Sequence, residues 1–210
     1  VREACLALLS VAERKELLKI LGFPREYGIP RSLLTTNATL MDEEVARGIV
    51  DSGIGIIQIS MDSHIKEKYE MIRAGAHFDR VVENIKYLRD YKKERKSSSP
   101  YIQFGCVLMR WNIEDVSDYL DFVHLLGANG VAFQHVVVYQ GSEISDQSLS
   151  LDKPLANRYL DLIREKCRTH GFHLNTIPEK FSLSPVAEKD LASRKKPAGR
   201  RKRTCLIPQS

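Results

Sequence analysis

The chain has 210 residues, 43% of them hydrophobic and 28% charged, which is enough apolar surface for the core of one domain and excludes a wholly disordered chain. No apolar run is long enough to cross a bilayer and the first segment lacks the pattern of a signal peptide, so we expect a cytoplasmic protein with no membrane partner. The net charge of +5 comes from one basic run near the C-terminus, so it does not characterise the folded part.

The first third of the chain predicts a helix, a strand and a second helix. Leucines at helical spacing favour a helix from about Arg2 to Leu21, with Gly22 as its end. Residues 32–36 have the pattern of a short strand. Asp42 is placed to cap the next helix, and Gly53 to end it.

The remaining sequence alternates strands with helices. Strands are expected at 55–60, 101–109, 131–139 and 172–174, and helices at 79–92, between 112 and 127, and at 155–169. The strand at 131–139 is the richest in β-branched residues, as is typical of a central parallel strand. This alternation implies right-handed βαβ units, so the predicted fold class is α/β with a parallel sheet covered by helices.

Polar side chains follow the predicted strands at the point where each strand ends. Thr36 and Asn37 end the first, Ser60 and Asp62 the second, and Arg110 and Asn112 the third, and His135 lies within the fourth. Ligands gather at the carboxyl ends of parallel strands, so we expect a binding site at this edge of the sheet.

After Thr176 the sequence becomes polar and basic, which predicts a domain boundary there. Residues 194–203 hold seven Lys and Arg side chains and no acidic one. Such a run binds nucleic acid or forms a solvated linker. No aromatic residue interleaves it for base stacking, which favours the linker and makes nucleic acid an unlikely partner.

The four cysteines are far apart in the sequence, at Cys5, Cys106, Cys167 and Cys205. They form no CxxC pair and no spacing typical of a zinc site. Cys106 and Cys167 fall within a predicted strand and on an apolar helical face, so we expect both to be small core residues rather than ligands.

The strand ends resemble those of one enzyme family. The segment Thr35–Leu40 reads TTNATL and resembles the TNG-x-L strand end of radical S-adenosylmethionine (SAM) enzymes. Ile59–Ser63 reads ISMDS and resembles their SxDG strand end, with Ser63 where Gly is commoner. Tyr69–Arg73 and Val107–Asn112 match the next segments in the same order. The resemblance covers about residues 32–139, and the order of the four matches is more specific than any one motif.

The resemblance implies a partial (β/α) TIM-like barrel. In this family a CxxxCxxC loop holds a [4Fe-4S] cluster, and one-electron reduction of cluster-bound SAM gives a 5′-deoxyadenosyl radical that abstracts a hydrogen atom from substrate. It also implies a reductant such as flavodoxin or ferredoxin, and a peptide or small-molecule substrate. The protein itself would position the cofactor and the substrate.

The sequence departs from the family pattern because it contains no CxxxCxxC motif. The glycine-rich segment that holds the SAM amino group is not visible either. With Val at position 1, we expect an internal fragment whose barrel lacks its first strand or strands and whose cluster ligands lie outside this chain. Such a chain would be inactive alone. The alternative is a degenerate, non-catalytic relative of the family.

A second resemblance lies at the C-terminus, where Thr204–Pro208 reads TCLIP. This is similar to the start of the SPASM extension, which binds auxiliary iron–sulfur clusters. We therefore expect residues 1–176 to form the partial barrel and residues 177–210 to be a basic linker leading into a truncated SPASM-like region. Cys205 is either a ligand of an auxiliary [4Fe-4S] cluster or an incidental surface thiol.

The resemblance assigns SAM contacts to five positions. Ser60 and Arg73 are predicted to bind SAM directly, Thr36 and Asn37 to supply polar groups, and Val136 or Val137, of which we favour Val137, to contact adenine. Each polar assignment has a structural alternative: Ser60 as a helix-entry cap, Arg73 paired with Glu67 or Glu70, and Asn37 in a turn.

Other polar residues at the strand ends favour structural roles. Asp62 is more simply a cap of the following helix than a substrate-binding group, and Asn112 the N-cap of the next one. His135 faces either the cavity or the core, because a one-residue shift reverses the direction of every strand side chain.

The sequence therefore predicts part of a radical SAM iron–sulfur enzyme that modifies a peptide or a small metabolite. A catalytically inactive α/β module that binds a ligand or a protein is the alternative. A third possibility, RNA modification, would use the basic run at 194–203.

Overall fold

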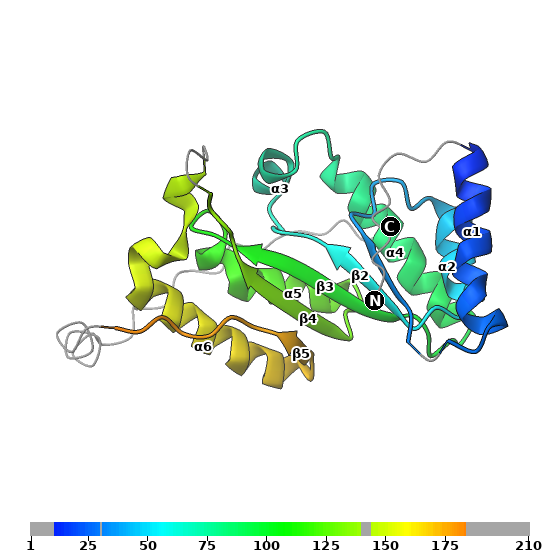
Figure 1. Ribbon diagram of the computed structural model, residues 1–210. Coiled ribbons are helices and arrows are strands. Elements are labelled where there is room, and N and C mark those ends of the chain that lie inside the picture. The colour runs from blue at the N-terminus through cyan, green and yellow to red at the C-terminus, as the bar shows by residue number, and fades with distance from the viewer. Residues whose placement is uncertain (1–10, 30, 140–143, 184–210) are drawn as a thin grey trace.

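The computed structural model describes residues 11–29, 31–139 and 144–183. Its centre is one sheet of five parallel strands in the order β1-β2-β3-β4-β5 (Figure 1). The strands are β1 (Leu33–Thr36), β2 (Ile56–Ser60), β3 (Tyr101–Leu108), β4 (Gly130–His135) and β5 (His173–Thr176). Strand order equals chain order, which confirms the predicted α/β class with a parallel sheet.

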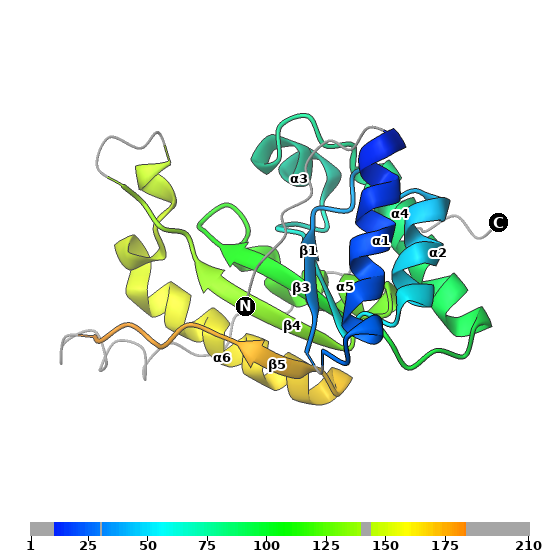
Figure 2. The same ribbon diagram turned by 45° about the vertical axis from the view of Figure 1, so that its right-hand side comes forward.

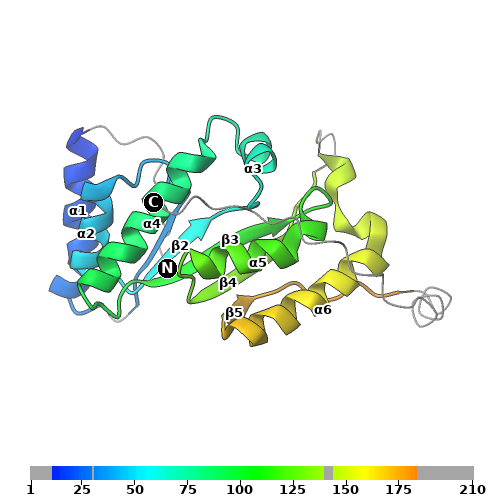
Figure 3. The same cartoon turned by 180° about the vertical axis from the view of Figure 1, so that it is seen from behind.

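Helices connect successive strands and cover one face of the sheet, where Figure 3 shows α4, α5 and α6. The helices are α1 (Val11–Glu26), α2 (Glu43–Ser52), α3 (Lys66–Ile72), α4 (Phe78–Glu94), α5 (Val116–Leu125) and α6 (Lys153–His170). Short 3-10 turns lie at η1 (Ile113–Asp115), η2 (Ser145–Gln147) and η3 (Leu149–Asp152). At the β1 side, α1 packs on α2 and α2 packs on α4.

The two faces of the sheet differ in polarity. Ile57 and Phe104 point toward the helices and are fully buried. The alternate positions carry amides that bond in a row across the strands: Gln103 donates to Gln58 at 2.7 Å, and Asn175 donates to Gln103 at 2.5 Å. Strand side chains alternate between faces, so this polar row lies on the side that α4, α5 and α6 leave uncovered.

The caps predicted for the second helix are confirmed. Asp42 Oδ1 accepts a hydrogen bond from Val45 N at 3.1 Å at the start of α2. Gly53 ends the helix in the left-handed region, with φ +75°. Both ends therefore have the local chemistry that the sequence indicates.

The predicted end of the first helix at Gly22 is wrong, because α1 continues through Gly22 and Pro24 to Glu26. Leu17 and Leu21 are buried. A Cβ at Gly48 of α2 would lie 2.0 Å from the side chain of Leu18, so the two helices approach closely. Packing against α2 thus outweighs the helix-breaking preferences of glycine and proline.

The strand predicted at 131–139 is also too long, since β4 ends at His135. The neighbouring strand β3 has already ended at Leu108, whose carbonyl accepts one last bond from Val136 N at 3.0 Å. Beyond this point there is no strand to pair with, and the side chains of Val137 and Tyr139 are exposed.

The segment after β5 packs back along α6. Asn157 donates to the carbonyl of Phe181 at 2.8 Å and accepts from its N–H at the same distance. The ring of Phe181 lies 4.7 Å from that of His135, which points to the helical side of the sheet. No helix among the described residues is long and apolar enough to span a membrane.

Candidate functional site at the carboxyl edge of the sheet

The turn after β1 is built by short side chains that bond to the local backbone. Thr36 Oγ1 accepts from Ala38 N, and Asn37 Oδ1 accepts from both the N–H and the hydroxyl of Thr39. Ala38 is fully buried with φ +59°, a conformation that favours glycine, which explains why a TNG-type turn suits this position. Asn84 of α4 donates to the Ala38 carbonyl at 2.8 Å and fixes the turn. The turn role of Asn37 is thereby confirmed, and its assignment to SAM stays a prediction.

The end of β2 brings Ser60, Asp62 and Ser63 to the same edge. Ser60 is half-buried and pairs in register with Gly105 of β3. Ser63, not Ser60, makes the hydrogen bond that shapes entry into the next helix, because its Oγ accepts from Ile65 N at 3.0 Å. The hydroxyl of Ser60 makes no hydrogen bond to another described residue, so it is available to a ligand.

Arg73 lies just after α3, which Figure 2 shows near the carboxyl ends of the strands. Its Nη2 lies 2.8 Å from Asp62 Oδ2. The alternative pairing with Glu67 or Glu70 is wrong: Glu70 instead accepts from Phe78 N at 2.9 Å. Within the described chain, Nε of Arg73 is buried and has no hydrogen-bond partner.

The capping role expected of Asp62 is wrong, and Asn112 occupies the N-cap position of η1 but its side chain makes no capping hydrogen bond. Asp62 Oδ1 accepts from Val107 N at 2.8 Å, and α3 begins only at Lys66. Asn112 donates to the carbonyls of Asp62 and Val107 at 2.8 Å and accepts from Met109 N at 2.9 Å. Both side chains therefore tie the end of β2 to the end of β3, which local sequence rules cannot reveal.

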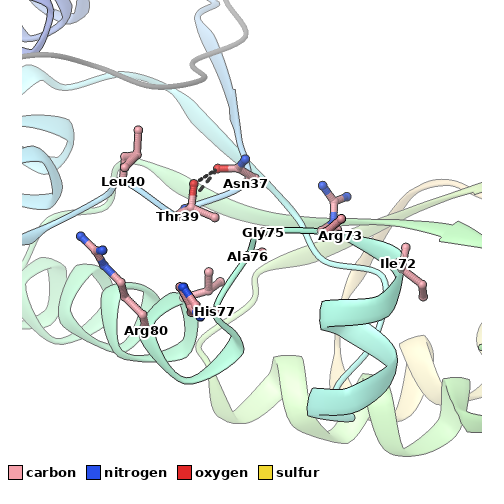
Figure 4. Close-up of a pocket in the computed structure, with 11 residues that line it drawn as sticks. Asn37, Thr39, Leu40, Ile72, Arg73, Gly75, Ala76, His77 and Arg80 are labelled. Carbon is pink, nitrogen blue, oxygen red and sulfur yellow. Dashed lines mark hydrogen bonds between the residues drawn. The ribbon is translucent and has the colours of Figure 1, made fainter.

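A cavity of about 510 Å³ opens between the turn after β1 and the α3–α4 loop (Figure 4). Its size is in the range of small-molecule sites. It is lined by polar and basic side chains and by small loop residues: Asn37, Thr39, Leu40, Ile72, Arg73, Ala74, Gly75, Ala76, His77, Arg80 and Val81. No acidic side chain lines it. The cavity thus suits a polar ligand with an anionic group.

The structure brings only some of the predicted site residues together. Asn37 and Arg73 line this cavity, and Thr36 and Ser60 lie at the neighbouring strand ends. The side chain of Val137 is 67% exposed in the segment after β4, and nothing in the described structure covers it. Cys205 and the basic run at 194–203 lie outside the described residues.

Neither described cysteine has the properties of a metal ligand. Cys106 and Cys167 are buried, as expected of core residues. Burial raises the pKa of Cys106 well above its usual value and that of Cys167 to about 11, so both are protonated near neutral pH. The described residues contain no group of three or more His, Cys, Asp or Glu side chains that could hold a metal ion.

Sequence reasoning missed the tie that Asp62 and Asn112 form. One sequence signal that could have revealed it is a carboxylate that closely follows a buried strand, when no helix begins near enough for that carboxylate to cap. A second signal is Asn112, which follows another strand by four residues. Polar groups at such positions are buried, so they must find partners on neighbouring strand ends.

Several known proteins are similar to this chain in sequence or in fold. The Fe-coproporphyrin III synthase of Methanosarcina barkeri is 26% identical over 168 residues, which are 79% of this chain and 39% of that protein. The crystal structure of Streptococcus suis SuiB matches with a TM-score of 0.61 and 16% identity, covering 78% of this chain and 36% of that one. The structure of anSMEcpe with bound AdoMet matches with a TM-score of 0.58 and 17% identity, covering 77% of this chain and 43% of that one.

The chain covers between 25% and 39% of the length of the curated relatives it matches. The structural matches share the same partial-barrel fold. The model of the Radical SAM superfamily matches residues 7–123, which is more than half of the chain and includes the strand ends that form the cavity. The chain therefore belongs to the radical SAM superfamily.

Proposed function

We propose that the protein acts in a radical SAM enzyme and that the carboxyl edge of its sheet holds SAM. The observation that carries this proposal is the buried Nε of Arg73, which has no partner in the described structure although a buried N–H normally has one. A carboxylate such as that of the methionine part of SAM would satisfy it. A guanidinium is well suited to this, because charge-assisted bonds to carboxylates are among the stronger hydrogen bonds in proteins.

The other residues of the edge fit the same ligand. Ser60 offers a hydroxyl that can donate and accept, at the end of β2 and two residues before Asp62. Thr36 and Asn37 hold the turn that forms one wall of the cavity. Val137 would contact adenine where the segment after β4 leaves the sheet. These side chains bind and orient the cofactor, and none of them is assigned a chemical step.

The iron–sulfur cluster implied by the family would supply the electron for reductive cleavage of SAM. Its ligands would lie outside this chain, since the sequence has no CxxxCxxC motif. Cys205 would serve an auxiliary [4Fe-4S] cluster in a SPASM-like region that follows a basic linker from residue 177. A flavodoxin or ferredoxin would act as reductant, in the cytoplasm.

The relatives support a peptide or a small metabolite as substrate. SuiB has been solved with its precursor peptide SuiA, and anSMEcpe with the Kp18Cys peptide. The Methanosarcina barkeri relative is named for a porphyrin product. We propose a substrate of one of these two kinds, modified by a radical reaction.

The test is SAM affinity in an Arg73→Ala variant of the parent protein that carries the cluster ligands, measured by equilibrium dialysis after anaerobic reconstitution with iron and sulfide. Loss of a charge-assisted hydrogen bond of about 1.5–3 kcal/mol predicts affinity about 10- to 100-fold weaker, with the iron content unchanged. Arg25→Ala is the matched control, because Arg25 is exposed at a different cavity. Equal SAM affinity in the Arg73 variant and the wild type would contradict the assignment.

A further inference from the structure

Asp62 is unusual for a carboxylate residue, because its side chain is only 5% exposed. One carboxylate oxygen is used by the backbone of β3, through Val107 N. The other, Oδ2, lies 2.8 Å from Arg73 Nη2 and forms an ion pair with it. A carboxylate is seldom buried to this extent unless it is paired, so the ion pair with Arg73 accounts for its presence.

The backbone of Asp62 is fixed as firmly as its side chain. Its carbonyl accepts from Asn112 Nδ2 at 2.8 Å, and the same amide group donates to the Val107 carbonyl. Asp62 therefore contacts the end of β3 through both its main chain and its side chain. Oδ2, the carboxylate oxygen that faces Arg73, therefore has a defined position relative to the strand ends.

The orientation of Arg73 follows from this fixed oxygen. A guanidinium is planar, with five N–H groups in a rigid fork, so anchoring Nη2 restricts the directions of the others. Arg73 lies at the C-terminus of a helix of seven residues and has no other ion-pair partner among the described residues. Asp62 is thus the ion-pair partner that restrains the guanidinium of Arg73 among the described residues.

Among the residues that the structure describes, no second anionic side chain forms an ion pair with this arginine. The hydroxyl groups of Tyr69 and Tyr119 are buried near the pair without hydrogen-bond partners in the described chain. Burial raises the pKa of both, so both stay neutral at physiological pH. Nε of Arg73 is buried without a hydrogen-bond partner in the described chain, and Arg73 lines a cavity that no acidic side chain lines.

We infer that Asp62, held by Asn112, is a positioning residue that orients Arg73 Nε toward the carboxylate of SAM. The inference rests on the proposed function, because it concerns the same cofactor. It makes SAM recognition selective for the carboxylate: without Asp62 the arginine remains charged but loses its fixed direction. Decarboxylated SAM lacks this carboxylate. A variant that only misdirects Arg73 should therefore bind decarboxylated SAM normally, whereas a variant with a disturbed fold should bind both ligands more weakly.

The experiment compares Asp62→Asn with the wild type for binding of SAM and of decarboxylated SAM by equilibrium dialysis. Asparagine keeps an oxygen for Val107 N and removes the charge that holds Arg73. We expect about 10-fold weaker binding of SAM and unchanged binding of decarboxylated SAM. In an Arg73→Ala background, Asp62→Asn should cause no further loss. Asp79→Asn is the matched control, since Asp79 is exposed and pairs with Lys66.

The outcomes separate the inference from the proposed function. If Arg73→Ala weakens SAM binding but Asp62→Asn does not, or weakens both ligands equally, Asp62 is not a positioning residue. If Arg73→Ala has no effect, the proposed SAM site fails together with the inference. If Asp62→Asn does not fold, Arg73→Lys replaces it, because lysine keeps the charge without the fork; full SAM affinity in that variant would overturn the inference.

Discussion

Replacing Asn112 by Asp tests whether the amide of Asn112 links the end of β2 to the end of β3. In the structure the amide of Asn112 donates to two carbonyls, those of Asp62 and Val107, and accepts from Met109 N. Aspartate has the same shape and keeps the acceptor, but it places an oxygen against two carbonyl oxygens. If Asn112 were only an N-cap, Asp would replace it without loss, since both residues cap helices equally well.

The magnitude follows from the bonds that are lost. A typical hydrogen bond contributes about 1 kcal/mol net, and a buried group left unsatisfied costs about 1–3 kcal/mol. With two bonds lost and a charge added at a side chain that is 4% exposed, we expect Asn112→Asp to lower the free energy of unfolding by at least about 3 kcal/mol.

The assay is urea unfolding at pH 7, followed by circular dichroism. Asp152→Asn is the control, because Asp152 is a true cap that accepts from Leu155 N, and we expect its free energy of unfolding to change by less than about 0.5 kcal/mol. If Asn112→Asp is as stable as the wild type, the bridging role of this residue is refuted.

Three further predictions concern the core and titratable groups. Gly130→Ala should lower the free energy of unfolding, measured in urea, by about 1–3 kcal/mol, because a Cβ there would lie 2.0 Å from the Tyr101 hydroxyl and 2.6 Å from the His173 carbonyl. A variant as stable as the wild type would contradict this packing. Burial lowers the pKa of His64 below 6.5, so its neutral form stabilises the fold above that pH, and stability falls as the pH drops through the lower, folded pKa. In His64→Gln, the midpoint of urea unfolding should therefore depend less on pH between pH 7.5 and 5.5. If the midpoint depends on pH as strongly as in the wild type, His64 is not the cause. Burial raises the pKa of Cys167 to about 11, so its thiol should react with a disulfide reagent at pH 8 only after the protein unfolds. Mass spectrometry of labelled peptides would measure this reaction, and rapid labelling of Cys167 in the native protein would contradict its burial.

The sequence predicts local features well where the cause is local. The caps at Asp42 and Gly53 depend on neighbouring backbone groups and are found as expected. The parallel sheet is also predictable, because strand–helix alternation leaves few other topologies. The end of α1 depends instead on packing against α2, which no local rule includes.

Two of the predicted site residues line one cavity, whereas the hydrogen bonds that join the strand ends could not be predicted from the sequence. Asn37 follows β1 and Arg73 follows α3, and both line the same cavity. The roles of Asp62 and Asn112 were not predictable, because their partners lie 45 and 50 residues away in the chain. Capping rules consider only the next helix, whereas burial forces both side chains to bond across strands.

Hydrogen–deuterium exchange with and without SAM tests most directly the claim that the carboxyl edge of the sheet receives the cofactor. The account predicts that SAM slows exchange of backbone amides in residues 60–63, which include Asp62 of the ion pair, and in residues 73–77, which line the cavity. Exchange in residues 95–99, at the cavity that also contains Arg25, should not change. Unchanged exchange at 60–63 and 73–77 under saturating SAM would contradict the account.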